Sequence, residues 1–370
     1  MTPRILVLAG EPSGDLHGGR VITALRARFP DATIEAVGGP RMAAAGATIR
    51  RSIDGLSAMG LVEILDKLPA HIQLLRALRR DFVAHRYDLI VLVDYPGFHL
   101  RVAEAAKRSG IKVLWYIAPQ FWAWRPDRAR RFARAVDRLA VILPFESSFF
   151  GGVGISTDYV GHPLVDREAL PSREEARAAL GVPADARVLA LFPGSRHGEI
   201  RRLWQSYRDA AQRVLDAGGC SHVLVAATTD GHYPDPGSLT LVADHPDLVL
   251  ASADAVLAKS GTTTLEAALA DVPMVVAYRV HPLTYRLLRP LIRVPWVSLV
   301  NLVADREVVP ELIQSAATPE LLAEAVLPLL DPAGEPARRQ RQGLAEVRRR
   351  LGGPGASERL AAVAGQMLVA

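Results

Sequence analysis

The stretch Val256–Glu266 constrains the fold more than any other part of this sequence. The short apolar run Ala255–Ala258 predicts a buried strand of a parallel sheet, and Thr264–Leu269 has helical character. A small turn, Ser260-Gly261, joins the two. A strand that enters a helix through such a turn leaves free backbone N–H groups at the helix start, which is a favourable place for an anion. An ordinary capped helix in an α/β domain is the alternative interpretation.

A second stretch of the same kind precedes it in the chain. Pro193-Gly194-Ser195-Arg196 places small residues and then a guanidinium at the end of an expected strand, which suits a phosphate group. Together with Ser260, Gly261 and Thr262, this gives two anion-binding helix starts in one half of the chain. Two such starts favour a diphosphate ligand, and two ordinary strand-to-helix turns are the alternative.

Two further polar residues are expected at the same pocket. Glu266 lies early on its helix, where a carboxylate can accept hydrogen bonds from the vicinal hydroxyls of a sugar. Its alternative role is to interact with the helix dipole. Asn301 follows Val297-Ser298-Leu299 and is expected to complete the pocket.

Apolar runs that alternate with helical segments extend this pattern over the whole chain, which predicts an α/β protein with doubly wound parallel sheets. The expected strands lie at 4–9, 33–37, 89–93, 113–117, 139–143, 187–192, 222–226, 255–258 and 274–278. A length of 370 residues suits two domains. We expect two Rossmann-like domains that face across a cleft, at 1–163 and 164–335, with a hinge at Gly161-His162-Pro163 and C-terminal helices at 336–370.

Composition limits the class of protein. A single cysteine, Cys220, fits a reducing compartment, and the first residues lack the apolar region of a signal peptide. No apolar run is long enough to span a bilayer, so a cytoplasmic protein is expected. The net charge is +5, yet no nucleic-acid motif accompanies it, and no Asp-x-Asp triplet or His/Cys cluster suggests a metal.

The first half carries its own candidates. Asp94 follows the apolar strand Leu89–Val93, where it can act as a general base or, alternatively, cap the helix that begins near His99. The aromatic loop Ala118–Arg125 can pack a ring or an acyl chain, or else form core at a domain interface. An apolar helical stripe with neighbouring arginines after Met59 is usually core, but would also suit a peripheral membrane enzyme.

Taken together, several short motifs resemble the lipid-A-disaccharide synthase family, in family order and across nearly the whole chain. These motifs lie at 9–15, 38–42, 59–63, 119–124, 143–146, 161–162, 193–196, 260–262 and 297–302. The resemblance implies a glycosyltransferase of the B-type fold and an inverting reaction that needs no metal and no cofactor. It implies that UDP-2,3-diacylglucosamine is joined to 2,3-diacylglucosamine 1-phosphate (lipid X), giving the β-1,6-linked lipid A disaccharide 1-phosphate and UDP.

The resemblance also assigns roles to residues. It implies that Asp94 is the catalytic base and that UDP lies in the second domain, against Gly194, Ser195, Arg196, Ser260, Gly261, Thr262, Glu266 and Asn301. The acceptor side would be in the first domain, at Glu11, Ser13, Gly14, Asp15, His17, Met59 and Trp122. Acylated substrates imply an enzyme bound peripherally to the inner face of the cytoplasmic membrane. The late helices would pack on the first domain or on a partner subunit, which would give a homodimer.

Two departures from the family pattern and two rival functions stay open. Pro96-Gly97-Phe98 stands where the family usually has Pro-Asp-Phe, so Asp94 has no second carboxylate beside it. The segment 227–254, which would help to frame the uracil, is shortened. One rival is another UDP-sugar enzyme of the same fold, such as UDP-N-acetylglucosamine 2-epimerase or the murein glycosyltransferase. The other is a non-catalytic, lipid-associated binder of nucleotide sugars.

Overall fold

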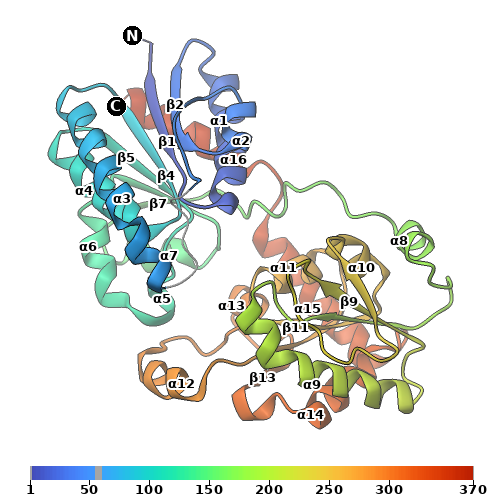
Figure 1. Ribbon diagram of the computed structural model, residues 1–370. Coiled ribbons are helices and arrows are strands. Elements are labelled where there is room, and N and C mark those ends of the chain that lie inside the picture. The colour runs from blue at the N-terminus through green and yellow to red at the C-terminus, as the bar shows by residue number, and fades with distance from the viewer. Residues whose placement is uncertain (1, 55–60, 370) are drawn as a thin grey trace. The chain divides into compact units, whose positions relative to one another are not determined.

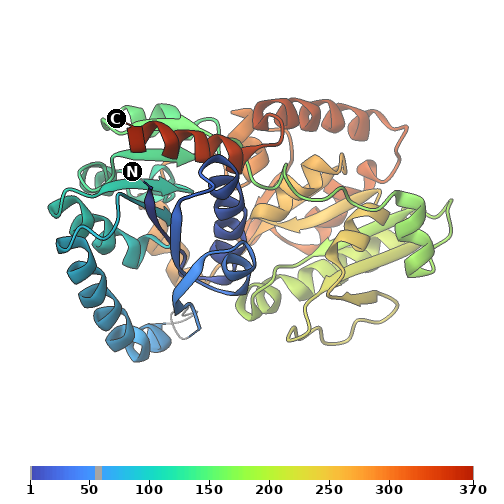
Figure 2. The same cartoon turned by 90° about the horizontal axis from the view of Figure 1, so that it is seen from above.

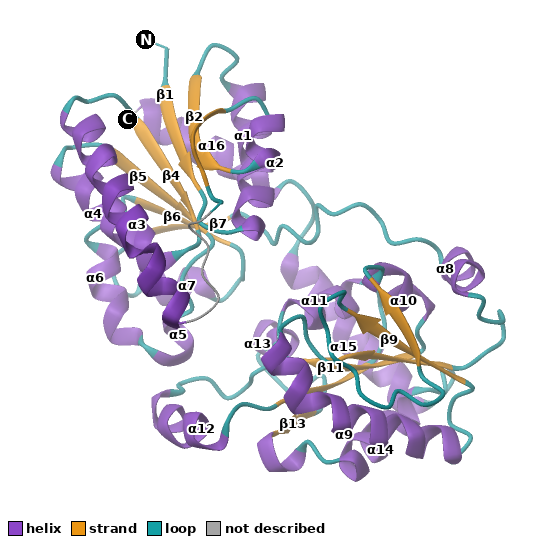
Figure 3. Ribbon diagram, in the orientation of Figure 1, coloured by secondary structure: helices purple, strands orange, loops and turns teal. Residues whose placement is uncertain are grey.

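In the computed structural model, which describes residues 2–54 and 61–369, the chain forms two α/β units (Figure 1). Unit 1 comprises Met1–Asp166 and Gly353–Ala370, and unit 2 comprises Arg167–Gly352. In each unit a parallel sheet is flanked by helices, as the colouring of Figure 3 shows. The predicted class, α/β with doubly wound parallel sheets, is confirmed.

The sheet of unit 1 has the order β3-β2-β1-β4-β5-β6-β7, and all of its strands are parallel. Its strands are β1 (Arg4–Leu8), β2 (Thr33–Gly38), β3 (Thr48–Ser52), β4 (Leu89–Val93), β5 (Lys112–Tyr116), β6 (Arg138–Val141) and β7 (Ser156–Tyr159). The central strand β4 is buried along its whole length, because its five residues are all leucine, isoleucine or valine.

The helices of unit 1 include the last one of the chain. They are α1 (Pro12–Arg28), α2 (Pro40–Ala44), α3 (Leu61–Val83), α4 (Pro96–Arg108), α5 (Phe121–Trp124), α6 (Ala129–Ala133), α7 (Glu146–Gly151) and α16 (Ala356–Val369), with the short 3-10 turn η1 (Pro126–Arg128). The blue α1 and the red α16 lie side by side (Figure 2). Leu360, Ala364 and Met367 of α16 belong to the same buried core as β1 and β4, so the end of the chain completes this unit.

The sheet of unit 2 has the order β10-β9-β8-β11-β12-β13 and is likewise parallel. Its strands are β8 (Val188–Phe192), β9 (His222–Ala227), β10 (Thr240–Ala243), β11 (Ala255–Lys259), β12 (Met274–Tyr278) and β13 (Glu311–Ile313). Its helices are α8 (Arg173–Leu180), α9 (His197–Asp216), α10 (Pro246–Ser252), α11 (Thr262–Leu269), α12 (Pro282–Leu288), α13 (Leu299–Ala304), α14 (Pro319–Val326) and α15 (Glu335–Leu351). The 3-10 turns are η2 (Arg289–Leu291), η3 (Gln314–Ala316) and η4 (Leu327–Leu329).

The strand orders determine where ligands can bind. In an open α/β sheet, ligands bind at the carboxyl ends of the strands, at the point where the strand order reverses. That point lies between β1 and β4 in unit 1 and between β8 and β11 in unit 2. The loops that follow these four strands contain Glu11, Asp94, residues 194–196 and residues 260–261.

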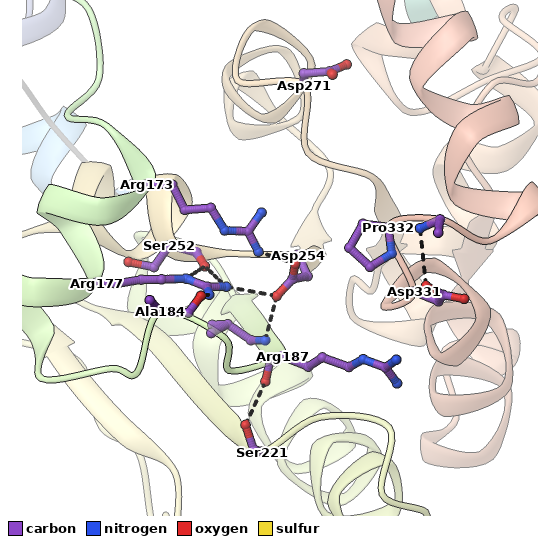
Figure 4. A network of polar contacts seen from close by, with 12 residues as sticks. Arg173, Arg177, Ala184, Arg187, Ser221, Ser252, Asp254, Asp271, Asp331 and Pro332 are labelled. Atoms are coloured by element: carbon purple, nitrogen blue, oxygen red, sulfur yellow. Dashed lines mark hydrogen bonds and ion pairs between the residues drawn. The ribbon is translucent and has the colours of Figure 1, made fainter.

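A buried ion pair fixes the opposite end of the unit 2 sheet (Figure 4). Asp254, which immediately precedes β11, is 2% exposed and accepts hydrogen bonds from Arg177 at 3.0 Å and from the backbone N–H of Val188 at 2.8 Å. Arg177, only 3% exposed, also donates to the carbonyls of Ser252 and Ala184, so its charge is well satisfied. The pair therefore ties α8 to the starts of β8 and β11.

Within residues 2–54 and 61–369, no helix combines the length and the apolar character needed to cross a membrane.

Candidate active site

A pocket of about 570 Å³ opens at the carboxyl ends of β8 and β11 in unit 2. Six of the eight residues expected to bind UDP line it, namely Gly194, Ser195, Arg196, Gly261, Thr262 and Glu266. Residues 194–196 follow β8, and residues 261–266 follow β11. The topology therefore brings the two predicted anion-binding turns together at one pocket.

The turn after β8 depends on glycine at position 194. Gly194 has a φ of +121°, and a Cβ atom there would come within 2.7 Å of the Glu199 side chain. An L-residue would therefore be strained by its backbone conformation and would also clash. Because the backbone passes so close to Glu199, the N–H of Ser195 can donate a hydrogen bond to the Glu199 carboxylate at 3.3 Å.

Two cationic side chains of the pocket lie beside the carboxylate of Glu199. Its carboxylate lies 2.9 Å from the Lys259 ammonium and 3.6 Å from the Arg196 guanidinium. Burial raises the pKa of Glu199, but hydrogen bonding and charge from Lys259, aided by Arg196, outweigh burial and hold the pKa below its usual value. An ionised carboxylate thus accepts hydrogen bonds from one backbone N–H and from Lys259, and it lies beside the charge of Arg196; all three groups are of the kind that bind phosphate oxygens.

Glu266 also lines the pocket, one turn into α11. Its carboxylate is paired with Arg167 at 2.5 Å, and its side chain is 27% exposed. Burial raises the pKa of Glu266, and the charge of Arg167 opposes this shift. The arginine orients the carboxylate while leaving it partly accessible, which suits an acceptor for sugar hydroxyls.

Ser260 and Asn301 have a different position from the one expected. The Ser260 hydroxyl donates to the carbonyl of Val297 at 2.6 Å. The Asn301 amide donates to the carbonyl of Val309 and to Glu311, both at 2.9 Å, and its oxygen accepts from two backbone N–H groups. Neither is among the residues that line the pocket, and Asn301 is completely buried. Ser260 holds the loop before α13, whereas Asn301 holds the segment between α13 and β13.

In unit 1, a smaller hollow of about 90 Å³ lies at the carboxyl ends of β1 and β4. Asp94 lines it together with Glu11, Ser13 and Gly14, so the structure brings the expected base and part of the expected acceptor side together. Gly10 also contributes, because the ring of Tyr95 packs directly on it. A Cβ atom at Gly10 would meet that ring at 2.2 Å.

The backbone that carries Asp94 is held in an unusual conformation. Asp94 and Tyr95 both have positive φ, +48° and +55°, which is uncommon for residues other than glycine. The N–H of Asp94 donates to the carbonyl of Tyr116 at 2.9 Å, and the carbonyl of Asp94 accepts from Nδ1 of His99 at 2.7 Å. Burial lowers the pKa of His99 to about 4, so this imidazole is a neutral donor at pH 7. Such over-determined local strain is typical of functional sites.

The Asp94 carboxyl has the pKa of a base that works near neutrality. Displacement of water by the surrounding protein raises this pKa, the N–H of Tyr95 opposes the shift, and the negative charge of Glu11 adds to it, giving a value of about 6. Asp94 is nevertheless exposed to solvent on its open side, so a hydroxyl group can reach it. A carboxylate with this pKa is ionised at pH 7 and is a stronger base than an ordinary aspartate.

The other four residues expected at the acceptor side differ in where they lie. Asp15 is 3% exposed and accepts from the backbone N–H groups of residues 39, 41 and 42, which caps α2. Trp122 is buried and donates its indole N–H to Glu146 at 3.0 Å. The buried Nδ1 of His17 has no hydrogen-bond partner among the described residues, and burial lowers the pKa of this histidine to about 4. Met59 lies outside the described residues.

Lys259 is the main pocket residue that sequence reasoning missed. It is the last residue of β11 and lies inside the stretch Val256–Glu266. Because the residues before it are apolar, the sequence indicated a strand and a turn there but no role for the lysine. The available signal was a lysine at the carboxyl end of a strand, beside a glycine turn.

Within residues 2–54 and 61–369, no group of three or more His, Cys, Asp or Glu side chains is arranged to hold a metal ion.

Comparison with known proteins finds relatives that match nearly the whole chain. A family model described as Lipid-A-disaccharide synthetase matches residues 5–362. The lipid-A-disaccharide synthase of Myxococcus xanthus (strain DK1622) is 43% identical over 369 residues, which cover 97% of this chain and 96% of that protein. The lipid-A-disaccharide synthase of Geobacter metallireducens is 42% identical over 374 residues, which cover 99% of this chain and 97% of that protein.

A solved structure shares the fold at much lower identity. The putative UDP-N-acetylglucosamine 2-epimerase from Listeria monocytogenes has a TM-score of 0.68 and 12% identity, covering 99% of this chain and 96% of its own. At this identity the likeness concerns the fold alone.

Proposed function

Because this chain belongs to the lipid-A-disaccharide synthetase family, we propose that it joins UDP-2,3-diacylglucosamine to 2,3-diacylglucosamine 1-phosphate. The enzyme is a glycosyltransferase of lipid A biosynthesis. The proposed products are the β-1,6-linked disaccharide 1-phosphate and UDP. The observation that supports a UDP-linked donor is the pocket of unit 2, where two strand-to-helix turns and two cationic side chains line one cavity.

The donor binds through its diphosphate in this proposal. Three groups surround the Glu199 carboxylate at 2.9 to 3.6 Å: the backbone N–H of Ser195, the guanidinium of Arg196 and the ammonium of Lys259. In the complex, a phosphate would take the place of that carboxylate beside them. Glu266 accepts hydrogen bonds from hydroxyl groups of the bound UDP-sugar. When UDP leaves, the same cations stabilise the charge that develops on it, so the reaction needs no metal.

Asp94 performs the transfer step. Its carboxylate takes the proton from the 6-hydroxyl of the acceptor while the oxygen of that hydroxyl forms a bond to the anomeric carbon of the donor. The bond from that carbon to UDP breaks on the opposite face, and UDP leaves with the electron pair. A single displacement of this kind inverts the configuration at the anomeric carbon, which gives the β linkage.

The acylated substrates determine the location that we propose. The enzyme binds peripherally to the inner face of the cytoplasmic membrane, which holds the acyl chains of both substrates, and it works there as a homodimer. The acceptor lies against Glu11, Ser13 and Gly14, which share the hollow with Asp94.

A product assay tests the proposed reaction. Purified protein is incubated with both acylated substrates in detergent micelles, with a chelator of divalent metals present. We expect release of UDP together with equal amounts of the phosphorylated disaccharide. Release of UDP without disaccharide would contradict the assigned acceptor, and turnover of UDP-N-acetylglucosamine alone would contradict the assigned donor.

Lys259→Gln is expected to weaken the binding of UDP about tenfold, because a hydrogen bond from a charged donor to a phosphate is lost. Isothermal titration with UDP measures this change. Lys259→Arg should retain most of the affinity, since the positive charge is kept. Glu199→Gln should strengthen binding, because the competing carboxylate loses its charge. If Lys259→Gln binds UDP as tightly as wild type does, Lys259 does not contribute to donor binding.

A further inference from the structure

The residues that link β12 to α13 carry an unusual concentration of exposed apolar side chains. Of the fourteen large apolar side chains that are exposed among the described residues, five lie between positions 283 and 292. They are Leu283, Leu287, Leu288, Leu291 and Ile292. Leu283 is 60% and Leu287 65% exposed. An exposed apolar cluster of this kind marks a surface that meets another molecule.

The same residues carry positive charge. Arg286, Arg289 and Arg293 alternate with the leucines, and the sequence has no acidic residue between Asp271 and Asp305. All three arginines are exposed, and none forms an ion pair with another residue in the part of the chain that the structure describes. We name residues 281–293 the docking segment.

The geometry of α12 separates the two kinds of side chain. On an ideal helix, the leucines at 283, 287 and 288 span an arc of about 140°, and Arg286 lies outside it. Figure 1 shows α12 set apart from the sheet of its own unit, joined to it by a loop on each side. The docking segment thus has an apolar face next to unpaired cations.

Both ends of the docking segment are fixed to unit 2. Before it, Arg279 donates to the carbonyls of Ala317 at 2.8 Å and Gln314 at 3.3 Å, and the Gln314 side chain accepts from the N–H of Val280 at 2.7 Å. After it, the N–H groups of residues 297 and 298 donate to Glu311 at 2.9 Å. The exposed leucines are therefore presented from an anchored base.

We propose that the docking segment binds the surface of a bilayer that contains anionic phospholipid. Leucines at the level of the headgroups and arginines beside them are the combination that binds an amphipathic helix to such a surface. A second copy of the chain is a poorer partner. In a symmetric dimer this patch would face itself, which would bring arginines against arginines with no acidic residue of the segment between them.

This inference rests on the membrane association proposed above and assigns it to named residues. Its test is sedimentation with vesicles of phosphatidylcholine containing phosphatidylglycerol, without any substrate. Leu288→Ser/Leu291→Ser should weaken vesicle binding about tenfold. The matched control is Leu241→Ser/Leu321→Ser, whose side chains have the same exposure, 40% and 42% against 41% and 41%, and it should bind as wild type does.

A charge variant separates the electrostatic contribution. Arg286→Gln/Arg289→Gln/Arg293→Gln should lose about fivefold in affinity per arginine for the anionic vesicles, and wild-type binding should weaken with salt. Turnover of substrates in detergent micelles should stay unchanged in the leucine variant, which also shows that this variant is folded.

The outcomes that overturn the proposal are distinct. A wild type that does not bind the vesicles contradicts membrane association itself. If wild type and the leucine variant bind the vesicles equally, the docking segment is not the part of the protein that binds the membrane. If the leucine variant binds vesicles normally but breaks a dimer, the segment is a protein interface. If it instead raises only the KM for acylated substrates, the segment contacts their acyl chains.

Discussion

Asp94→Asn is expected to lower kcat of the transfer reaction by about 10²–10⁴-fold, because the variant lacks the general base that takes the acceptor proton. Asparagine has nearly the same shape as aspartate, so the strained turn after β4 and its bonds to Tyr116 and His99 should persist. The affinity for UDP should not change, since the donor pocket belongs to unit 2 and Asp94 to unit 1. Single-turnover assays of disaccharide formation, with titration of UDP, measure both quantities.

The matched control for this experiment is Asp127→Asn. Asp127 is an exposed aspartate on η1 of the same unit, with only a 3.9 Å contact to Arg125, so its variant should have wild-type kcat. An Asp94→Asn enzyme that keeps kcat within about threefold of wild type would exclude general-base catalysis by this residue.

The pH profile provides a second readout of the same residue. Because the pKa of Asp94 is raised to about 6, the base form is lost as the pH falls through 6. The rate of the chemical step should therefore rise with pH up to about 6 and level off above it. Glu11→Gln removes a negative charge that contributes to the raised pKa, so the acid limb of the profile should move to lower pH. An acid limb that stays in place in Asp94→Asn would belong to another group.

The second large effect concerns the stability of unit 2. Asp254→Asn is expected to lower the free energy of unfolding by about 3–5 kcal/mol, because it leaves the buried guanidinium of Arg177 without its counter-charge. The asparagine oxygen can still accept the N–H of Val188, so the loss reports mainly the charge. Urea unfolding followed by circular dichroism measures the change.

Two further variants give this stability experiment its controls. Asp235→Asn removes a carboxylate that is 91% exposed and lies 3.8 Å from Arg208, so the free energy of unfolding should change by less than about 1 kcal/mol. Arg177→Met/Asp254→Leu, which removes both charges, should be less destabilised than Asp254→Asn. An Asp254→Asn protein as stable as Asp235→Asn would show that the pair has no structural role.

The sequence predicted the central strands of both sheets, since β1, β4, β8, β11 and β12 are apolar runs whose burial needs no further information. It did not predict β3, β7, β10 or β13. These strands are short and partly polar, as in Thr48–Ser52 and Ser156–Tyr159, and their burial is only partial. Such residues become a strand because a neighbouring strand supplies hydrogen-bond partners, and that neighbour is distant in the sequence.

The candidate site divides in the same way. Local sequence determined the two glycine turns at Gly194 and Gly261, because a strand, a small turn and a helix start are contiguous in the chain. Only the tertiary structure decided that Lys259 and Glu199 meet in that pocket, whereas Asn301 satisfies all its hydrogen bonds inside the protein. A polar side chain in a sequence has the same chemistry whether it binds a ligand or braces a loop. The partners that the fold brings to it determine which of the two it does.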